Sequence, residues 1–376
     1  MRLTDEIFLE ETIVKVIIIN AILYTNEEKI VKKVNSVKDC MICDLCSAFT
    51  ERGHDVTLIA AEEYKPIDDE GFPFHIVWMK SYFKLIFIAN KIPFNLGIRK
   101  YLRSHDFDLI ISSEAFSMDT FLAAITCPEK LIIWQEMAFH QRMAKQLASK
   151  LWHNVIIRLF YKDVRVVPRS DNAKAFISKY MTNVSPVIIQ HGIDLAKFNY
   201  EMNKDRTFIV SSQLIARKRI DLIIKAFCNF CANSSNEFVL YIAGDGDQKK
   251  NLELLTNRLG IADKVIFLGK VPHSELIGYL RKAMAMLVYT QKDNSMISIA
   301  ESIAVGTPVI TTNVPDNAKY VKDYNLGIVS DNWDWQELDK IVADNQRYIS
   351  NCKEYRVNLD NRHNVGLFIE EFSKLV

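Results

Sequence analysis

The sequence predicts an α/β protein built from two doubly wound, Rossmann-like domains. Short runs rich in Ile and Val alternate with amphipathic stretches along almost the whole chain. These runs are apolar throughout rather than at every second residue, which is typical of parallel strands covered on both faces. The chain has 376 residues, which is long for one hydrophobic core, and two domains of roughly 150 to 200 residues are expected.

The predicted strands follow one another in order, with helical patterns between most of them. In the first half they are 14–20, 56–60, 74–79, 109–112, 131–134, 164–167 and 187–190. In the second half they are 208–212, 239–243, 265–268, 285–289 and 309–312, with helices predicted at 221–230, 249–259 and 274–283.

We place the domain boundary in the polar stretch 191–206, which separates two strand patterns. The first domain is then 1–198 and the second 199–363, and the amphipathic segment 364–376 is expected to cross back onto the first domain as a helix. Ligands of such sheets bind beyond the carboxyl ends of the strands, so two facing domains predict a cleft between them.

Composition narrows the function classes. Apolar residues make up 49% and charged residues 25%, as in ordinary globular proteins. The formal net charge is +1, from 47 basic and 46 acidic residues, which argues against a general nucleic-acid binder. The first residues are acidic, and no uncharged apolar run approaches about 18 residues, so we expect neither a signal peptide nor a membrane span and place the protein in the cytosol.

Two cysteine sets raise the alternative of a metal site. Cys40, Cys43 and Cys46 recur every three residues, and Cys228 and Cys231 repeat that spacing. Both sets lie in helical patterns, where the same spacing follows a buried stripe. We therefore predict core packing and no metal.

The segment 289–312, YTQKDNSMISIAESIAVGTPVITT, is the most informative of the chain. It contains Asp293, seven intervening residues, Glu301 and a Gly-Thr-Pro-Val turn, in a strand, loop and helix context. Ser295 is a plausible N-cap, and the backbone N–H groups of the next residues, together with the helix dipole, predict a phosphate site; these residues are Met296, Ile297 and Ser298. The plain alternative is two solvated acids.

Five pieces of the second half, in order, resemble the donor domain of the retaining GT-B glycosyltransferases of family 4. They are QHGIDLAKF at 190–198, SSQLIARKRIDLIIKAF at 211–227, YIAGDGDQKKNLE at 241–253, VIFLGKVPHSEL at 265–276 and the block at 293–312. They extend from 190 to 312, about 120 residues, in matching order and context. The first half resembles this family mainly in topology. In the second half, Asp293 followed by Asn294 resembles the motif of some bacterial capsule and exopolysaccharide transferases.

The resemblance implies roles for individual residues. Glu301 corresponds to the acid that holds the donor ribose, and Asp293 to the acid at the transferred sugar. Lys218 corresponds to the basic residue that faces the diphosphate, where a cation stabilises the departing nucleotide. Gln213 occupies a position at which the family usually has Arg. The candidates to offset this departure are Arg217, Arg219 and the helix N-terminus.

The resemblance also suggests further donor contacts. Gly244 and Gly246 follow a strand and precede a helix, as a nucleotide-facing turn requires, although a tight turn alone explains them equally well. Val271 is expected to pack near the base. On the acceptor side we choose Glu136 as the polar contact that orients the attacking hydroxyl, with His140 second; both follow the predicted strand at 131–134.

Two stretches of the first half combine basic and aromatic residues. Residues 80–103 contain six Lys or Arg and no acid, and residues 137–162 contain five and no acid. An anionic bilayer surface selects this combination, whereas the plain alternative is buried aromatics beside solvated cations.

We therefore expect a cytosolic, membrane-peripheral retaining glycosyltransferase with no cofactor. It is expected to transfer a hexosyl or related sugar, without a metal, from a UDP-linked donor to a glycan or lipid-linked acceptor in polysaccharide biosynthesis. Two alternatives remain open. One is a catalytically silent, glycosyltransferase-like binding subunit, suggested by Gln213 and Asp293, and the other is a sugar-nucleotide epimerase on the same fold.

Overall fold

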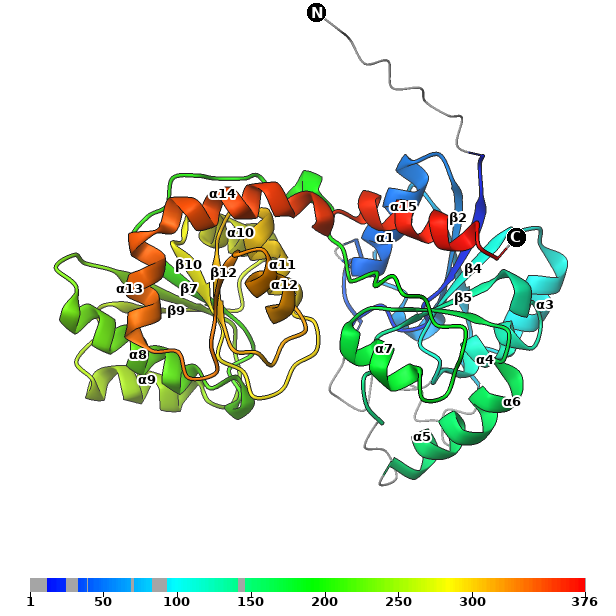
Figure 1. Cartoon of the computed structure of the whole chain (residues 1–376), viewed down its shortest axis with the longest axis horizontal. Helices are drawn as coiled ribbons and strands as arrows, with labels where there is room; N and C mark the ends of the chain where they lie inside the picture. Colours follow the sequence, from blue (N-terminus) through cyan, green and yellow to red (C-terminus); the bar gives the residue numbers. More distant parts are fainter. Residues whose placement is uncertain are drawn as a thin grey trace, which may run out of the picture. The chain divides into compact units, whose positions relative to one another are not determined.

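The computed structural model describes residues 12–24, 33–38, 40–68, 71–82, 93–140 and 146–375. The chain divides into two compact units (Figure 1). Unit 1 comprises Met1–Gln190 and Asn364–Val376, and unit 2 comprises His191–His363. Each unit contains a parallel sheet with helices on both faces, which is the predicted fold class.

The sheet of unit 1 has the strand order β3-β2-β1-β4-β5-β6, with every neighbouring pair parallel. Its strands are β1 (Lys15–Ile19), β2 (Asp55–Ala61), β3 (His75–Met79), β4 (Leu109–Ser113), β5 (Leu131–Gln135) and β6 (Arg165–Pro168). Its helices include α1 (Met41–Glu51), α3 (Gly97–Ser104), α4 (Met118–Ala124), α5 (Leu147–Leu151), α6 (Arg158–Phe160), α7 (Asp171–Ile177) and α15 (Asn361–Phe372).

Strand β1 shows why the runs are apolar throughout. Val16 and Ile18 are buried in the core on one face of the sheet, together with residues of α1 and Phe368 of α15. Ile17 and Ile19 are buried in the core on the other face. Each residue of a central strand therefore needs an apolar side chain, whichever face it points to.

The sheet of unit 2 has the order β12-β11-β10-β7-β8-β9 and is likewise parallel. Its strands are β7 (Thr207–Ser211), β8 (Val239–Ala243), β9 (Val265–Gly269), β10 (Ala285–Leu287), β11 (Val309–Thr311) and β12 (Gly327–Val329). Its helices include α8 (Ile220–Asn233), α9 (Lys249–Arg258), α10 (His273–Lys282), α11 (Ile297–Ala304), α12 (Ala318–Asp323), α13 (Trp335–Ala343) and α14 (Asn345–Tyr355).

Two strand predictions differ from the structure. The predicted strand at 187–190 is wrong, since this segment has no ladder partner among the described residues; Ile189 N–H donates to the carbonyl of Pro168, the last residue of β6, at 3.0 Å. Its apolar side chains pack against the core of unit 1 without forming a strand. Conversely, β12 was not predicted, because its three residues are too few for a periodic signal.

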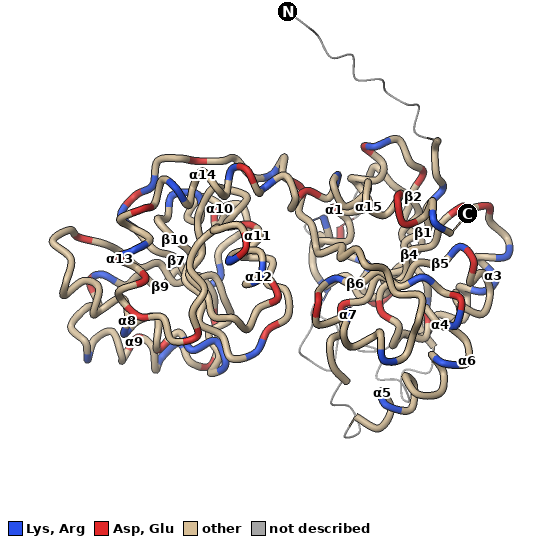
Figure 2. Tube along the Cα trace, in the orientation of Figure 1, with Lys and Arg blue, Asp and Glu red and all other residues tan. Residues whose placement is uncertain are grey.

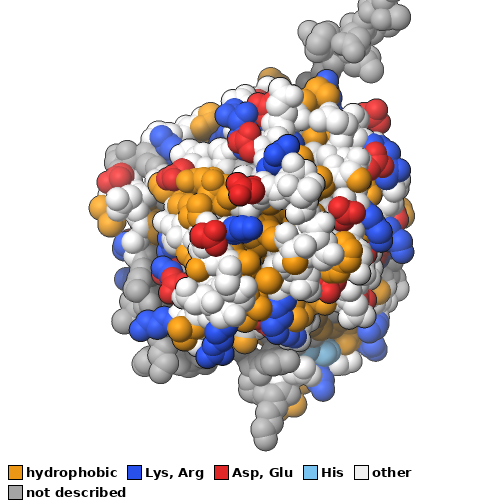
Figure 3. Space-filling model, turned by 90° about the vertical axis from the view of Figure 1, so that its left-hand side faces the viewer, with side chains coloured by type: hydrophobic (Ala, Val, Ile, Leu, Met, Phe, Trp, Pro, Cys, Tyr) orange, Lys and Arg blue, Asp and Glu red, His pale blue; other side chains and the backbone are white. Residues whose placement is uncertain are grey.

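The cysteines pack as predicted. Cys43 and Cys46 of α1 are buried in the core of unit 1 and Cys40 packs against it, while Cys228 and Cys231 pack against the core of unit 2. Acidic and basic residues are interspersed over both units (Figure 2), and the face in Figure 3 likewise mixes both signs among hydrophobic side chains. Among the described residues, no helix is both long and apolar enough to cross a bilayer.

Candidate functional site

In unit 2, two predicted residues meet where the strand order reverses. The chain winds from β7 to β9 in one direction and from β10 to β12 in the other, so the loops after β7 and β10 flank the switch point. Ligands of doubly wound sheets bind at this point. The loop after β7 carries Lys218, and the loop after β10 carries Asp293.

A cluster of ionic hydrogen bonds surrounds Asp293, and we call it the Asp293 cluster. Lys218 Nζ donates to Asp293 Oδ2 at 2.8 Å, and Arg217 Nη1 donates to Oδ1 at 2.8 Å. Thr290 Oγ1 also donates to Oδ2, at 2.5 Å. Burial would raise the pKa of Asp293, but the hydrogen bonds from Lys218, Thr290 and Arg217 outweigh it and lower the pKa below its ordinary value. Asp293 is therefore ionised at neutral pH.

The local backbone holds Lys218 against the sheet. Residues Ala216–Lys218 form a single 3-10 turn, and Arg219 then adopts a left-handed conformation with φ of 42° before α8 begins. The Lys218 side chain is consequently buried, whereas that of Gln213 in the same loop is exposed. Arg219 pairs with Asp221, at 3.0 Å between Nε and Oδ1. Arg217, rather than Arg219, is the arginine that joins the Asp293 cluster.

Glu301 lies in the first turns of α11 and has a different partner from Asp293. Its side chain is buried, and Oε1 lies 2.7 Å from His273 Nε2. His273 is the first residue of α10 and follows the turn that contains half-buried Val271. The structure thus places Val271 in the segment that leads to the partner of Glu301.

The start of α11 differs from the prediction. Ser295 is not the N-cap: the N-cap position is Met296, with no side-chain cap, and Ser295 Oγ donates to Asn317 Oδ1 at 3.4 Å. Met296 N–H donates to the same Asn317 oxygen, so it is not a free donor. Ile297 and Ser298 lie in the first turn, where N–H groups have no partner within the helix. They are the two predicted phosphate donors that retain this geometry.

Gly244 and Gly246 permit a close approach of two backbone segments. A Cβ on Gly244 would lie 1.8 Å from Ser212 O, and one on Gly246 would lie 2.3 Å from Leu214 O. Leu214 N–H donates to Asp245 O at 2.9 Å, which closes this contact. The glycines therefore let the turn after β8 lie against the loop that leads to Lys218.

In unit 1, Glu136 lies just beyond β5 and is held by an arginine that the sequence analysis missed. Arg169 Nη1 donates to Glu136 Oε2 at 2.9 Å, and Nη2 donates to Ser113 Oγ at 3.1 Å. The guanidinium carbon lies 3.7 Å from the centroid of the Trp134 ring. This stacking fixes the buried Arg169 side chain, which in turn orients the carboxylate of Glu136.

Glu114 completes this arrangement, and we call Glu114, Glu136 and Arg169 the Glu114 cluster. Glu114 follows β4 with φ of 69°, a strained conformation for this residue type. Its Oε1 accepts hydrogen bonds from Glu136 N–H at 2.8 Å and from Met137 N–H at 3.2 Å. Burial and, to a lesser degree, the charge of Glu136 raise the pKa of Glu114 to about 7, although Arg169 opposes the shift. The strained backbone aims this carboxylate at the loop that carries Glu136.

His140 has both ring nitrogens engaged within unit 1. Nδ1 lies 3.0 Å from Ser149 Oγ, and Nε2 lies 3.0 Å from Tyr180 OH. Burial and then the charges of Lys150 and Lys179 lower the pKa of His140, which favours the neutral ring. A neutral imidazole has one donor and one acceptor, and these two hydroxyls occupy both.

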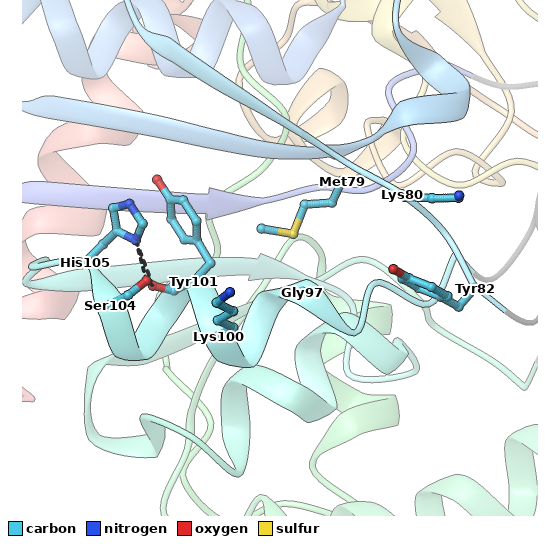
Figure 4. A pocket seen from close by; sticks show the side chains of 8 residues that line it. All are labelled: Met79, Lys80, Tyr82, Gly97, Lys100, Tyr101, Ser104 and His105. Atoms are coloured by element: carbon cyan, nitrogen blue, oxygen red, sulfur yellow. Dashed lines mark hydrogen bonds between the residues drawn. The ribbon is translucent and has the colours of Figure 1, made fainter.

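Part of the basic stretch 80–103 borders a pocket of about 280 Å³ between the end of β3 and α3 (Figure 4). Residues 83–92 of that stretch lie outside the described residues. Tyr101 stacks on His105, with ring centroids 3.9 Å apart, at one side of the pocket. Its basic side chains are Lys80 and Lys100.

The residues that sequence reasoning missed share one property, namely that their partners are distant in the sequence. Arg169 lies 33 residues from Glu136, and His273 lies 28 residues from Glu301. The spacing of residues within one motif cannot predict contacts between residues so far apart in the sequence. The available signal was position, since Glu114, like Glu136, lies two residues after the end of a predicted strand, where functional side chains of these sheets gather.

Family models match most of the chain. The model described as "Glycosyl transferases group 1" matches residues 193–362, and the model described as "Glycosyltransferase Family 4" matches residues 41–197. The Asp293 cluster falls in the first of these regions and the Glu114 cluster in the second.

Individual relatives are distant. A region of 189 residues is 27% identical to the alpha-monoglucosyldiacylglycerol synthase of Streptococcus pneumoniae, and it spans 46% of this chain and 43% of that protein. An uncharacterized glycosyltransferase of Haemophilus influenzae is 20% identical over 89% of this chain and 94% of its own length. The crystal structure of Anabaena HepE in complex with UDP matches with a TM-score of 0.70 at 14% identity, covering 96% of this chain and all of that one. That last similarity shows a shared GT-B fold.

Proposed function

Because the chain belongs to the group 1 and family 4 glycosyltransferases, we propose that it transfers a sugar with retention from a UDP-linked donor to a glycan or lipid-linked acceptor. The observation that carries the donor assignment is the Asp293 cluster at the switch point of unit 2. Anabaena HepE, which shares the fold, binds UDP, and this supports UDP as the nucleotide.

Lys218 is proposed to stabilise the departing nucleotide diphosphate. An ammonium has three N–H donors, and one of them is directed to Asp293, so Lys218 can contact Asp293 and a phosphate together. Its low exposure keeps water away from this charge, which strengthens its effect on a developing negative charge. Arg217 offsets the missing family arginine at Gln213 by adding a second cation to the cluster.

The remaining donor contacts follow from α11 and its neighbours. We assign the ribose hydroxyls to Glu301 and the phosphates to the N–H groups of Ile297 and Ser298. Asp293, held by its two cations, is assigned to the transferred sugar. In this scheme protein cations carry the role that a metal has in other transferases, so activity is expected to persist in chelator.

On the acceptor side, Glu136 is proposed to orient the attacking hydroxyl. Its carboxylate is held by Arg169, and its backbone is held by Glu114. Glu114 is a positioning residue in this scheme. His140 is reassigned from the acceptor to structural support, because Ser149 and Tyr180 occupy its nitrogens.

The acceptor class is proposed from the relatives. The Streptococcus pneumoniae relative is named for a glucosylated diacylglycerol, and relatives from Escherichia coli are named for lipopolysaccharide and O-antigen synthesis. We therefore propose a cytosolic enzyme that works at the inner face of the cell membrane in the synthesis of a capsule or another polysaccharide.

The test is a transfer assay with a panel of UDP-hexoses, run with and without acceptor lipids and with and without chelator. We expect transfer by the wild type and its loss in Glu301→Ala and in Asp293→Ala, with the exposed Lys322→Met in α12 as the matched control. Nucleotide binding without any turnover would favour the silent binding subunit. Conversion of the donor to its epimer without an acceptor would favour the epimerase.

A further inference from the structure

In the helical segment 147–160 of unit 1, side chains of one kind recur every four residues. It runs from α5 through a π-helical stretch, Trp152–Ile157, into α6. A π turn takes roughly one more residue than an α turn, so residues four apart stay closer to one line here than in a regular α-helix. The side chains of this segment accordingly form stripes with a period of four.

One stripe faces the core of unit 1. It consists of Ser149, His153, Ile157 and Tyr161, which are all buried. Ser149 contacts His140 at 3.0 Å, and Tyr161 OH donates to Ala115 O at 3.2 Å. The orientation of the helix on the unit is therefore fixed by this stripe.

The stripe two residues before each of these positions is apolar and exposed. Leu147 is 69% exposed, Leu151 62%, Val155 39% and Leu159 68%. With a period of four, a shift of two residues places this stripe opposite the buried one. A solvated helix carries polar residues on that side, so an aliphatic row there indicates a surface that is covered in use.

A basic stripe adjoins the apolar one. It contains Lys150, Arg158 and Lys162, with the neutral Asn154 in the same row, and all four are exposed. Residues 146–162 contain no acidic residue. Figure 2 shows Lys or Arg on both α5 and α6. The remaining stripe includes Trp152, which is half-buried, and Phe160, which is 45% exposed. Aliphatic residues flanked by cations and an aromatic fit the boundary between the acyl chains and anionic headgroups of a bilayer.

We propose that the exposed face of 147–160 lies in the surface of an anionic membrane, with its Leu row among the acyl chains and its basic row at the headgroups. This narrows the membrane contact predicted for 137–162, because Tyr161 is buried and Trp152 packs on Phe116 and Phe121. Exposed aliphatic residues, rather than those two aromatics, form the contact. The inference rests on the proposed function only for the role of the membrane contact, which is to bring unit 1 to a lipid-linked acceptor.

The test is sedimentation of the full chain with vesicles of phosphatidylcholine, with or without phosphatidylglycerol, in the absence of any donor sugar. We expect binding to the anionic vesicles that weakens with salt. The double variant Leu151→Gln and Leu159→Gln should reduce partitioning about tenfold or more. The variants Lys150→Gln and Lys162→Gln should reduce it about fivefold each on anionic vesicles alone.

The matched control is Leu254→Gln, which removes a leucine that is 54% exposed on α9 of unit 2 and should bind as the wild type does. Melting temperatures should be unchanged in all variants, and the pair Leu147→Gln and Val155→Gln provides a second test if the first pair unfolds. Unchanged vesicle binding in both pairs, or equal loss in the control, would overturn the proposal. A wild type that forms a dimer, does not bind vesicles, and dissociates when either pair of substitutions is made would also overturn the proposal. Because no donor is present, a failure of sugar transfer leaves this test intact.

Discussion

The substitution Glu114→Gln separates the positioning role of Glu114 from a merely structural one. In the wild type this carboxylate accepts the N–H groups of Glu136 at 2.8 Å and of Met137 at 3.2 Å. A Gln side chain has the same shape but is neutral, so both N–H groups lose their charged acceptor. Hydrogen bonds to charged groups contribute about 1.5–3 kcal/mol each. We expect kcat for transfer to fall about tenfold to a hundredfold, with donor KM unchanged.

The pH dependence gives this prediction a definite sign. Burial raises the pKa of Glu114 from its ordinary value of 4.5 to about 7, so between these values the folded state holds a proton that the unfolded state has released. The stability contributed by Glu114 is therefore complete below about pH 4.5 and is lost as the pH rises through about 7. The slope is at most about 1.4 kcal/mol per pH unit. The stability of Glu114→Gln should not fall over this pH range, because Gln does not titrate.

Activity should change in the opposite direction. Only the ionised carboxylate offers charged acceptors to the loop, so wild-type kcat should rise with pH around 7, and Glu114→Gln should lack that rise. Urea unfolding at a series of pH values and kcat profiles over the same range measure the two effects. A variant that retains both the wild-type pH profile and the wild-type kcat would refute the reasoning.

Four further substitutions, one of them a control, test the donor unit. Gly246→Ala should destabilise the fold by about 1–3 kcal/mol, because the added Cβ would lie 2.3 Å from a backbone oxygen. The control Gly278→Ala has open space around it in a helix and should stabilise the fold by up to about 1 kcal/mol. Urea unfolding measures both free energies. Arg217→Gln should lower kcat about tenfold and leave the fold intact, because its side chain is 41% exposed; an unchanged kcat would show that Arg217 does not offset the missing arginine. His273→Leu should raise donor KM several-fold more than kcat changes, since it frees the Glu301 carboxylate from its partner; equal effects on both constants would argue against a binding role.

The sequence predicted what depends on local patterns. Both parallel sheets follow from apolar runs such as 14–20, and Lys218 and Asp293, chosen by resemblance, meet at the switch point. The N-cap at Ser295 failed because its hydroxyl donates to Asn317, which lies 22 residues later, rather than accepting from an N–H group of α11. Glu114 was missed for a related reason, since its role depends on its positive φ and on the N–H groups of Glu136 and Met137, which follow the next strand.

The most direct test of the central claim is equilibrium binding of labelled UDP to the wild type, to Lys218→Met and to the exposed control Lys322→Met. The account predicts saturable binding in the wild type and the control, and affinity at least about tenfold weaker in Lys218→Met, because a buried charged contact to phosphate is lost. Circular dichroism should show all three proteins folded. A wild type that does not bind UDP, or a folded Lys218→Met that binds it equally well, would contradict the placement of the donor at the Asp293 cluster.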